Sequence, residues 1–340
     1  MRPTHRRVLG AAALLATAAA TVLATPAEAG RRAVTTTVYD TFDGDAAAYA
    51  ARWDTPYGAG EMAVNDTRAH DGSTFSLSAL PFATGYDFSV FDHIKYLGVS
   101  RTPFTVPEKG SVTFSLTIDA ETVGTQPGGR VIHGVYGPPG CADTPACAAT
   151  AVPWQATALE GQQAGATLHM IDFRTGQLFD WFVSGSTAFA LVERLPATVI
   201  GSPDGGTRDT MYTQIVKEVP VGPGPHRVSI TFSRDPGSSS VDFVLDGKRV
   251  ARVGKVGVPL DVQKVPYTGI YPSIGKGERL DDRVDSVFIG HGLFSLLDAF
   301  PFQHPDAPEL SVSVPMSERL FGQGAGASFD DMVVTVDDRG

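Results

Sequence analysis

Hydrophobic and polar residues alternate along most of the chain, in short runs that end at Gly, Pro, Asn or Asp. A period of two is typical of β-strands that bury one face. Residues 241–245 and 248–253 are two such runs, separated only by Asp246 and Gly247, and this dipeptide predicts a β-hairpin. Further alternating runs lie at residues 111–118, 167–173, 177–183, 187–194, 227–232 and 328–336.

Helical patterns are rare. The Ala-rich residues 45–52 predict one short helix and residues 294–300 another. Many strands with few crossover helices favour antiparallel sheets in a sandwich or barrel. We therefore predict an all-β protein, an antiparallel β-sandwich with long inserted loops and few short helices. It forms a single domain over residues 37–337, after a flexible segment at residues 30–36.

The first 29 residues have the pattern of a secretory signal peptide. Three arginines precede an apolar, Ala-rich run at residues 9–24, and small residues at 27 and 29 suit a signal peptidase. A membrane anchor is the alternative, but this run is shorter than the roughly 20 residues that cross a bilayer. The sequence predicts cleavage before Gly30 and a secreted, extracellular protein, and it leaves the Sec and Tat routes open.

Composition excludes several partners. The net charge is −10, with 27 basic and 37 acidic residues and no run of Lys or Arg, which disfavours nucleic acid as a partner. After the leader no apolar stretch is long enough for membrane insertion of the mature chain. The oligomeric state stays open. The only cysteines, Cys141 and Cys147, predict a disulfide that closes a small loop in an oxidising compartment.

Several short motifs occur in an order that resembles the concanavalin A-like lectin and glucanase superfamily. They are Phe42-Asp-Gly followed by Trp53, residues 241–253, and residues 329–334. The resemblance implies a jelly roll of two curved antiparallel sheets, in which the first and last strands pair and the concave face binds glycans. The glucanase branch carries Glu-x-Asp-x-Glu on one strand, whereas this chain has only Asp119-Ala-Glu121, with Val123 in the third position. The glucanase mechanism is therefore not transferred.

A second resemblance covers most of the chain after the leader. Residues 170–196, 292–301 and 319–325 are similar to a family of secreted actinobacterial proteins of unknown function. This resemblance implies the same jelly roll and no particular activity.

Two carboxylates on neighbouring predicted strands are the candidate catalytic pair if the protein is an enzyme. Asp180 and Glu193 interrupt apolar strand faces, and a carboxyl group among apolar neighbours tends to have a raised pKa, which suits a general acid. Glycoside hydrolysis needs two carboxyl groups roughly 5–9.5 Å apart. The alternative is an ion pair at the strand ends, in which one of these acids binds Arg194 or Arg174.

Four residues are candidates for ligand binding. Trp154, which follows Pro153 in a predicted loop, and Tyr136 are expected to stack on a sugar ring, whereas Trp53 and Trp181 are expected in the core. Arg194 and His291 complete the set. His291 lies between Gly290 and Gly292, and its alternative is a turn histidine bonded to a carbonyl.

Cofactor motifs are lacking, apart from one metal site that the resemblance implies. No zinc-binding His spacing occurs, and the Gly-rich residues 322–326 precede a predicted strand and not a helix, which disfavours a nucleotide. Jelly rolls of this kind carry a structural calcium ion where the first and last strands meet. Asp43, Asp330 and Asp331 are the oxygen ligands at that place.

These expectations favour a secreted, lectin-like glycan-binding protein without a cofactor, whose partner is an extracellular polysaccharide. Two alternatives stay open. One is a glycoside hydrolase or polysaccharide lyase that uses Asp180 and Glu193. The other is a structural or surface-associated protein without a ligand.

Overall fold

The computed structural model describes residues 32–55, 65–83, 94–125, 129–158, 164–207, 210–256, 277–280, 283–295, 311–319 and 321–340. The predicted signal peptide and most of the predicted helix at residues 294–300 lie outside these residues. Phe294 itself ends a strand, β19, and is therefore not helical.

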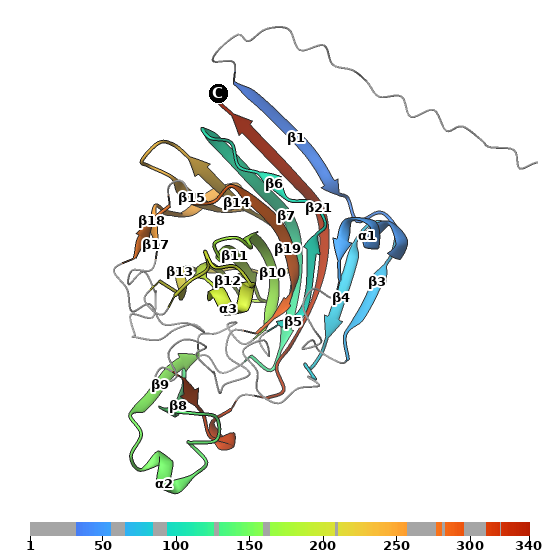
Figure 1. Cartoon of the computed structure of the whole chain (residues 1–340). Helices are drawn as coiled ribbons and strands as arrows, with labels where there is room; N and C mark the ends of the chain where they lie inside the picture. The colour runs from blue at the N-terminus through green and yellow to red at the C-terminus, as the bar shows by residue number, and fades with distance from the viewer. Residues whose placement is uncertain are drawn as a thin grey trace, which may run out of the picture.

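Two large antiparallel sheets form the body of the protein, and each has eight strands in its described part. Figure 1 shows that both sheets are curved and that the second, sheet B, lies inside the curve of the first, sheet A. This arrangement confirms the predicted all-β antiparallel sandwich.

Sheet A has the order β16 (Lys248–Val253), β15 (Ser240–Leu245), β14 (His226–Arg234), β7 (Gly110–Val123), β21 (Gly324–Asp338), β4 (Phe75–Ala79) and β3 (Thr67–His70), and β1 (Ala33–Asp40) also pairs with β21. Sheet B has the order β13 (Tyr212–Pro220), β12 (Thr187–Arg194), β11 (Gln177–Val183), β10 (Gly165–Asp172), β19 (Ser286–Phe294), β5 (Ile94–Ser100) and β2 (Trp53–Asp54), and β6 (Phe104–Thr105) also pairs with β19.

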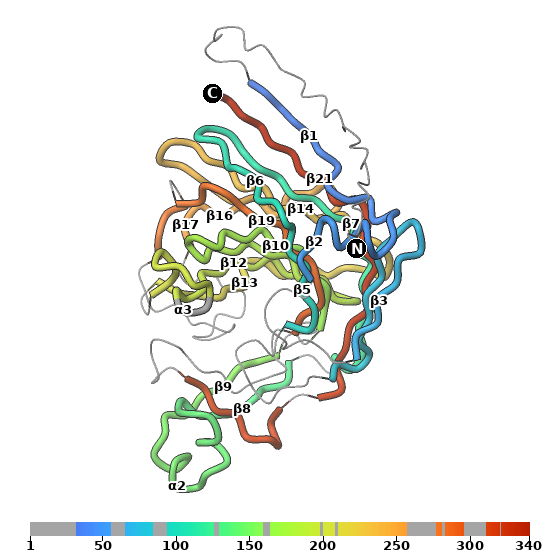
Figure 2. Tube along the Cα trace, turned by 45° about the vertical axis from the view of Figure 1, so that its right-hand side comes forward, coloured from blue at the N-terminus to red at the C-terminus, as the bar shows by residue number. Residues whose placement is uncertain are grey.

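Smaller elements complete the described chain. Figure 2 shows a small sheet below the two large ones. It has the order β20 (Val312–Ser313), β8 (Arg130–Tyr136) and β9 (Pro153–Ala158), and β17 (Lys255–Val256) pairs with β18 (Glu278–Arg279). The helices are α1 (Ala46–Arg52), α2 (Pro145–Ala148), α3 (Ala197–Ile200) and the 3-10 helix η2 (Met316–Glu318).

The first and last strands pair, as the resemblance to concanavalin A-like proteins implies. β1 runs antiparallel to β21 from Ala33, which lies opposite Asp338. Residues 30–36 were expected to be a flexible segment before the domain. From Ala33 onward that expectation is wrong, because the segment joins sheet A as a strand.

Local sequence signals explain the shorter features. Asp246 and Gly247 both adopt positive φ, at 49° and 76°, as a two-residue hairpin turn requires. Asp45 caps α1 because its carboxylate accepts hydrogen bonds from the backbone amides of Ala47 and Ala48. Cys141 and Cys147 form the predicted disulfide within the loop that contains α2.

The core lies between the two sheets and follows the alternation of the strands. On β7 the side chains of Val112, Phe114, Leu116 and Ile118 are fully buried, and they share a cluster with Met170, Phe179 and Trp181 of sheet B. Each such large apolar side chain stabilises the fold by about 1.5–3 kcal/mol. Trp53 and Trp181 are both in this core, as predicted.

His291 is also close to this core and not in a turn, and ligand binding by His291 stays a prediction. It lies within β19, where both flanking glycines are strand residues and not turn residues. Its ring is fully buried, with Trp53 in edge-to-face contact at a centroid distance of 4.5 Å, and its Nε2 is 2.7 Å from the hydroxyl oxygen of Tyr49. Burial lowers the pKa of His291 to about 3.

This buried base predicts a specific loss of stability in acid. Below pH 6.5 the unfolded chain binds a proton at residue 291, whereas the folded chain does not until about pH 3. The free energy of unfolding therefore falls by about 1.4 kcal/mol per pH unit from this residue as the pH drops through that window. Urea unfolding between pH 6 and pH 4 should show a shallower pH dependence for His291→Gln than for the wild type.

His133 provides the matched control, because its side chain is 62% exposed. The variant His133→Gln should keep the wild-type slope. Equal slopes for His291→Gln and the wild type would contradict the burial of an uncharged His291.

Candidate functional site: an acid pair on the concave face of sheet B

Three ionisable side chains lie on adjacent strands of sheet B, on the face that points away from sheet A. They are His169 of β10, Asp180 of β11 and Glu193 of β12. Successive side chains of a strand point to opposite faces. The residues next to these three in sequence pack in the core between the sheets, so the three themselves lie on the concave face.

His169 and Asp180 are directly opposite each other in the β10–β11 register. His169 Nδ1 lies 2.5 Å from Asp180 Oδ1, and the two residues are only 5% and 4% exposed. On the other side of His169, the opposing residue of β19 is Gly290. A Cβ atom at position 290 would lie 3.0 Å from the Cβ of His169, so the glycine leaves the imidazole the room that it occupies.

Asp180 and Glu193 are diagonal neighbours across β11 and β12. Asp180 lies opposite Leu191, and Glu193 lies opposite Leu178. Diagonal neighbours on one face are about 7–8 Å apart. From this backbone spacing the two side chains can bring their carboxyl groups within the range of roughly 5–9.5 Å at which such groups cooperate in glycoside hydrolysis.

The surroundings of the two acids set their protonation. Burial raises the pKa of Asp180, and the adjacent His169 opposes that rise. Burial, and then the charge of Asp180, raise the pKa of Glu193 to about 8. Glu193 therefore holds its proton at neutral pH beside a second carboxyl group that is bonded to an imidazole.

The rest of the concave face is apolar. The side chains form one buried cluster: Leu97, Val99, Ile171, Leu178, Phe182, Phe189, Leu191, Ile215 and Phe294. Glu193 is partly exposed among them. In the described chain, two further polar atoms of β10 on this face, Thr167 Oγ1 and His169 Nε2, are buried without a hydrogen-bond partner.

The alternative assignment of Asp180 or Glu193 to an ion pair with an arginine is wrong. The carboxylate that Arg174 contacts is Asp285, at 2.9 Å. Arg194 pairs with Glu278, which comes from β18. The strand alternation explains this difference, because Arg194 points to the opposite face of β12 from Glu193.

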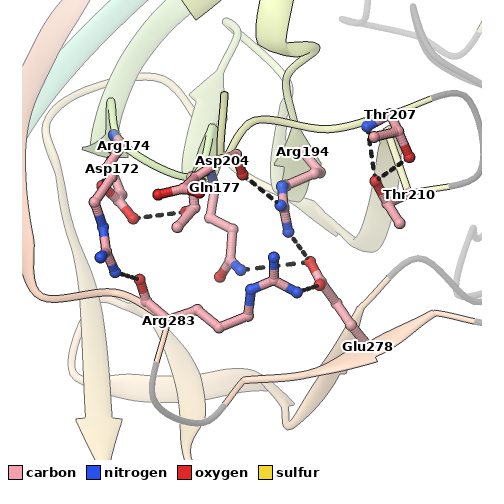
Figure 3. Close-up of polar contacts among 10 residues, drawn as sticks. Asp172, Arg174, Gln177, Arg194, Asp204, Thr207, Thr210, Glu278 and Arg283 are labelled. Carbon is pink, nitrogen blue, oxygen red and sulfur yellow. Dashed lines mark hydrogen bonds and ion pairs between the residues drawn. The ribbon is translucent and has the colours of Figure 1, made fainter. Parts of the chain in front are cut away.

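Arg194 belongs to a buried polar network at one end of sheet B (Figure 3). Its Nη2 donates to the carbonyl oxygen of Asp204 at 2.8 Å, and Glu278 also accepts hydrogen bonds from Arg283 and Gln177. Arg194 is 1% exposed and bound to its own chain. Its guanidinium connects the segment at Asp204 and strand β18 to sheet B, and ligand binding by Arg194 stays a prediction.

Asp172, at the end of β10, has a structural role in the same region (Figure 3). Its carboxylate accepts hydrogen bonds from the backbone amide of Arg174 at 2.9 Å and from the Thr175 hydroxyl at 2.6 Å. These contacts fix the turn that leads into β11. Asp172 therefore lies among apolar strand residues because its carboxylate stabilises this turn.

The two aromatic residues predicted to stack on a sugar lie in the small sheet. Trp154 is in β9 and not in a loop, and it is 4% exposed within an apolar cluster that includes Ile132 and Val312. Tyr136 ends β8 and packs against the same cluster. The expected exposure of Trp154 is wrong, because its strand turns the indole toward the interior of the small sheet.

The predicted calcium ligands do gather where β1 and β21 meet. The charges of Asp331 and Asp43 both raise the pKa of Asp330, after burial does so. Arg227 lies beside them, and its Nη1 donates to the carbonyl oxygen of Asp331 at 2.7 Å. Within the described ranges no group of three or more His, Cys, Asp or Glu side chains is arranged to hold a metal ion, and the calcium site stays a prediction.

A family model matches residues 152–338, which is more than half of the 340-residue chain. The chain belongs to DUF6081, a family of unknown function. The DUF6081 match contains His169, Asp180 and Glu193, and it confirms the predicted membership of a family of unknown function. No curated protein matches the sequence.

Solved structures with similar architecture include two enzymes and a lectin-like domain. β-Agarase B from Zobellia galactanivorans has a TM-score of 0.43 and 12% identity, over 90% of this chain and 94% of its own. An endo-1,3-β-glucanase from Streptomyces sioyaensis has a TM-score of 0.36 and 9% identity, over 92% of this chain and 99% of its own. A legume lectin-like domain from Entamoeba histolytica has a TM-score of 0.36 and 5% identity, over 86% and 92%. Similarities at these scores do not indicate a function for this DUF6081 chain.

No helix in the described residues has the length and apolarity that a membrane crossing requires.

The Arg194 network predicts a large and local effect on stability. Arg194→Met removes one cation from the buried Glu278 carboxylate, and breaking a buried pair costs about 3 kcal/mol or more. Arg249→Met is the control, because Arg249 is 57% exposed in its pair with Asp242, and such surface pairs are worth less than about 1 kcal/mol. Urea unfolding measures both. An equal loss of unfolding free energy in the two variants would show that the Arg194 network stabilises the fold no more than an exposed ion pair does.

Proposed function

We propose that this protein cleaves a glycan at the concave face of sheet B, with Glu193 as the general acid and Asp180 as its partner carboxylate. The observation that carries the proposal is the position of the two acids. They are diagonal neighbours on one face, and the pKa of Glu193 is raised to about 8.

The chemistry follows from the two protonation states. A protonated carboxyl group donates its proton to the oxygen of the leaving sugar, and an ionised carboxylate either activates a water molecule or attacks the sugar directly. Glu193 suits the first role because it keeps its proton at neutral pH. We assign the second role to Asp180, because its contact with His169 favours the ionised form, although burial has the larger effect and raises its pKa.

His169 acts as a positioning residue in this proposal. Its ring holds the Asp180 carboxyl group at one oxygen, and Gly290 leaves the space in which the ring sits. This contact fixes the direction of Asp180 relative to Glu193. A fixed geometry is what two cooperating groups need.

The substrate that we propose is an extracellular polysaccharide. The leader-like residues 1–29 support export, and the net charge of −10 disfavours a polyanionic partner such as nucleic acid.

The acid pair predicts the outcome of a substrate screen. The purified protein should release reducing ends from at least one member of a polysaccharide panel. Glu193→Gln and Asp180→Asn should each lower kcat about 100-fold or more, because each removes one proton-transfer group. Glu121→Gln is the control, since Glu121 is exposed on β7 of sheet A and should leave kcat unchanged. Wild-type kcat in both site variants would refute the proposal.

The raised pKa of Glu193 predicts the alkaline limit of activity. A general acid works only while it is protonated, so kcat should fall as the pH rises through about 8. Glu193→Asp should move this limit, because a shorter side chain changes both the burial of the carboxyl group and its distance from Asp180. A pH profile on the substrate found in the screen gives the measurement, and a constant kcat from pH 7 to pH 10 would contradict the role of Glu193.

Glycan binding without cleavage is the second candidate. Thr167 Oγ1 and His169 Nε2 favour it, because these two atoms of the concave face are buried without a hydrogen-bond partner among the described residues and could bond the hydroxyl groups of a sugar. A polysaccharide pull-down distinguishes the two functions. Retention on a polymer that is never shortened supports binding alone, whereas reducing-end release supports the enzyme.

A further inference from the structure

β1 forms an unprotected edge of sheet A. In the described part of the chain it pairs only with β21, and most of its residues are exposed. Val34 and Val38 are among the most exposed large apolar side chains, at 55% and 57%. Figure 1 shows β1 at the margin of the sheet, with the end of β21 beside it.

This edge differs from the opposite edge of the same sheet. β16 carries Lys248, Arg249 and Arg252, and charges of this kind prevent edge-to-edge association. Residues 33–38 of β1 carry no charge and no proline, and the register slips only after Val38. The nearest charge, Arg32, is held by Asp337 at 2.7 Å.

The exposed segment is complementary to itself. Residues 34–38 read Val-Thr-Thr-Thr-Val in both directions. Two copies in antiparallel register about Thr36 place each Val34 opposite a Val38 and each Thr36 opposite its counterpart. Every second residue of β1 directs its backbone N–H and C=O away from β21, where a second strand accepts and donates hydrogen bonds.

We propose that β1 pairs with β1 of a second copy of this chain, antiparallel and centred on Thr36, so that the two copies of sheet A become one continuous sheet. Such a contact is isologous and closes as a dimer. It involves sheet A only, and it is independent of the function proposed above.

Opposite charges at Thr36 test this register directly. Thr36 is exposed, and its hydroxyl is hydrogen-bonded to the hydroxyl of the half-buried Thr335 at 3.2 Å, so Thr36→Lys and Thr36→Glu should both fold. In the proposed register each variant sets two like charges directly opposite, which should raise the dissociation constant of the dimer roughly fivefold or more. Mixing the two variants pairs Lys with Glu and should restore the dimer as a heterodimer.

Sedimentation velocity on the purified protein gives the readout, and circular dichroism of each variant checks the fold. Val123→Lys is the control, because Val123 is 44% exposed on sheet A at the end of β7. We expect a wild-type dimer, weakened homodimers of the two Thr36 variants, a restored dimer in their mixture and an unchanged dimer in the control. A monomeric wild type at its highest soluble concentration, an assembly larger than a dimer, or Thr36 variants that associate as the wild type does would each overturn the proposal.

Discussion

The packing of sheet B against sheet A fixes the two faces of β10, β11 and β12, and the proposed function depends on this packing. Met170, Phe179 and Val192 are buried against sheet A. Because side chains alternate, the same contact places His169, Asp180 and Glu193 on the concave face. A slip of one residue in any of the three strands would turn its ionisable side chain into the core and move an apolar side chain to the concave face.

Charged groups are destabilised at this position, and this destabilisation raises the pKa of both acids. An isolated carboxylate is poorly solvated among Leu, Ile and Phe side chains, so its protonated form is favoured. Asp180 has an imidazole partner, whereas Glu193 has a carboxyl neighbour that makes its ionisation harder still. Two acids of similar intrinsic strength thus have different neighbours: an imidazole opposes the rise in the pKa of Asp180, whereas a carboxylate adds to the rise in the pKa of Glu193.

The sequence predicted what depends on local pattern. The strands, the Asp246-Gly247 turn and the short helix at residues 45–52 all follow from short-range sequence patterns. The alternation also put His169 on a face with Ile171, but its bond to Asp180 depends on the register between two strands, which one strand does not reveal. Arg194, Trp154 and His291 were assigned to ligand binding for their residue type. Their burial results from Glu278, the small sheet and Tyr49, which are distant in the sequence.

Glu193 is protonated at neutral pH because its apolar surroundings and the charge of Asp180 raise its pKa to about 8. Carboxyl ¹³C chemical shifts in protein labelled at glutamate test it, with Glu193→Gln used to assign the resonance. The account predicts a titration near pH 8 in the wild type, and a lower midpoint in Asp180→Asn, where the neighbouring charge is removed. A Glu193 resonance that titrates near the ordinary value of about 4.3, in the wild type and the variant alike, would contradict it.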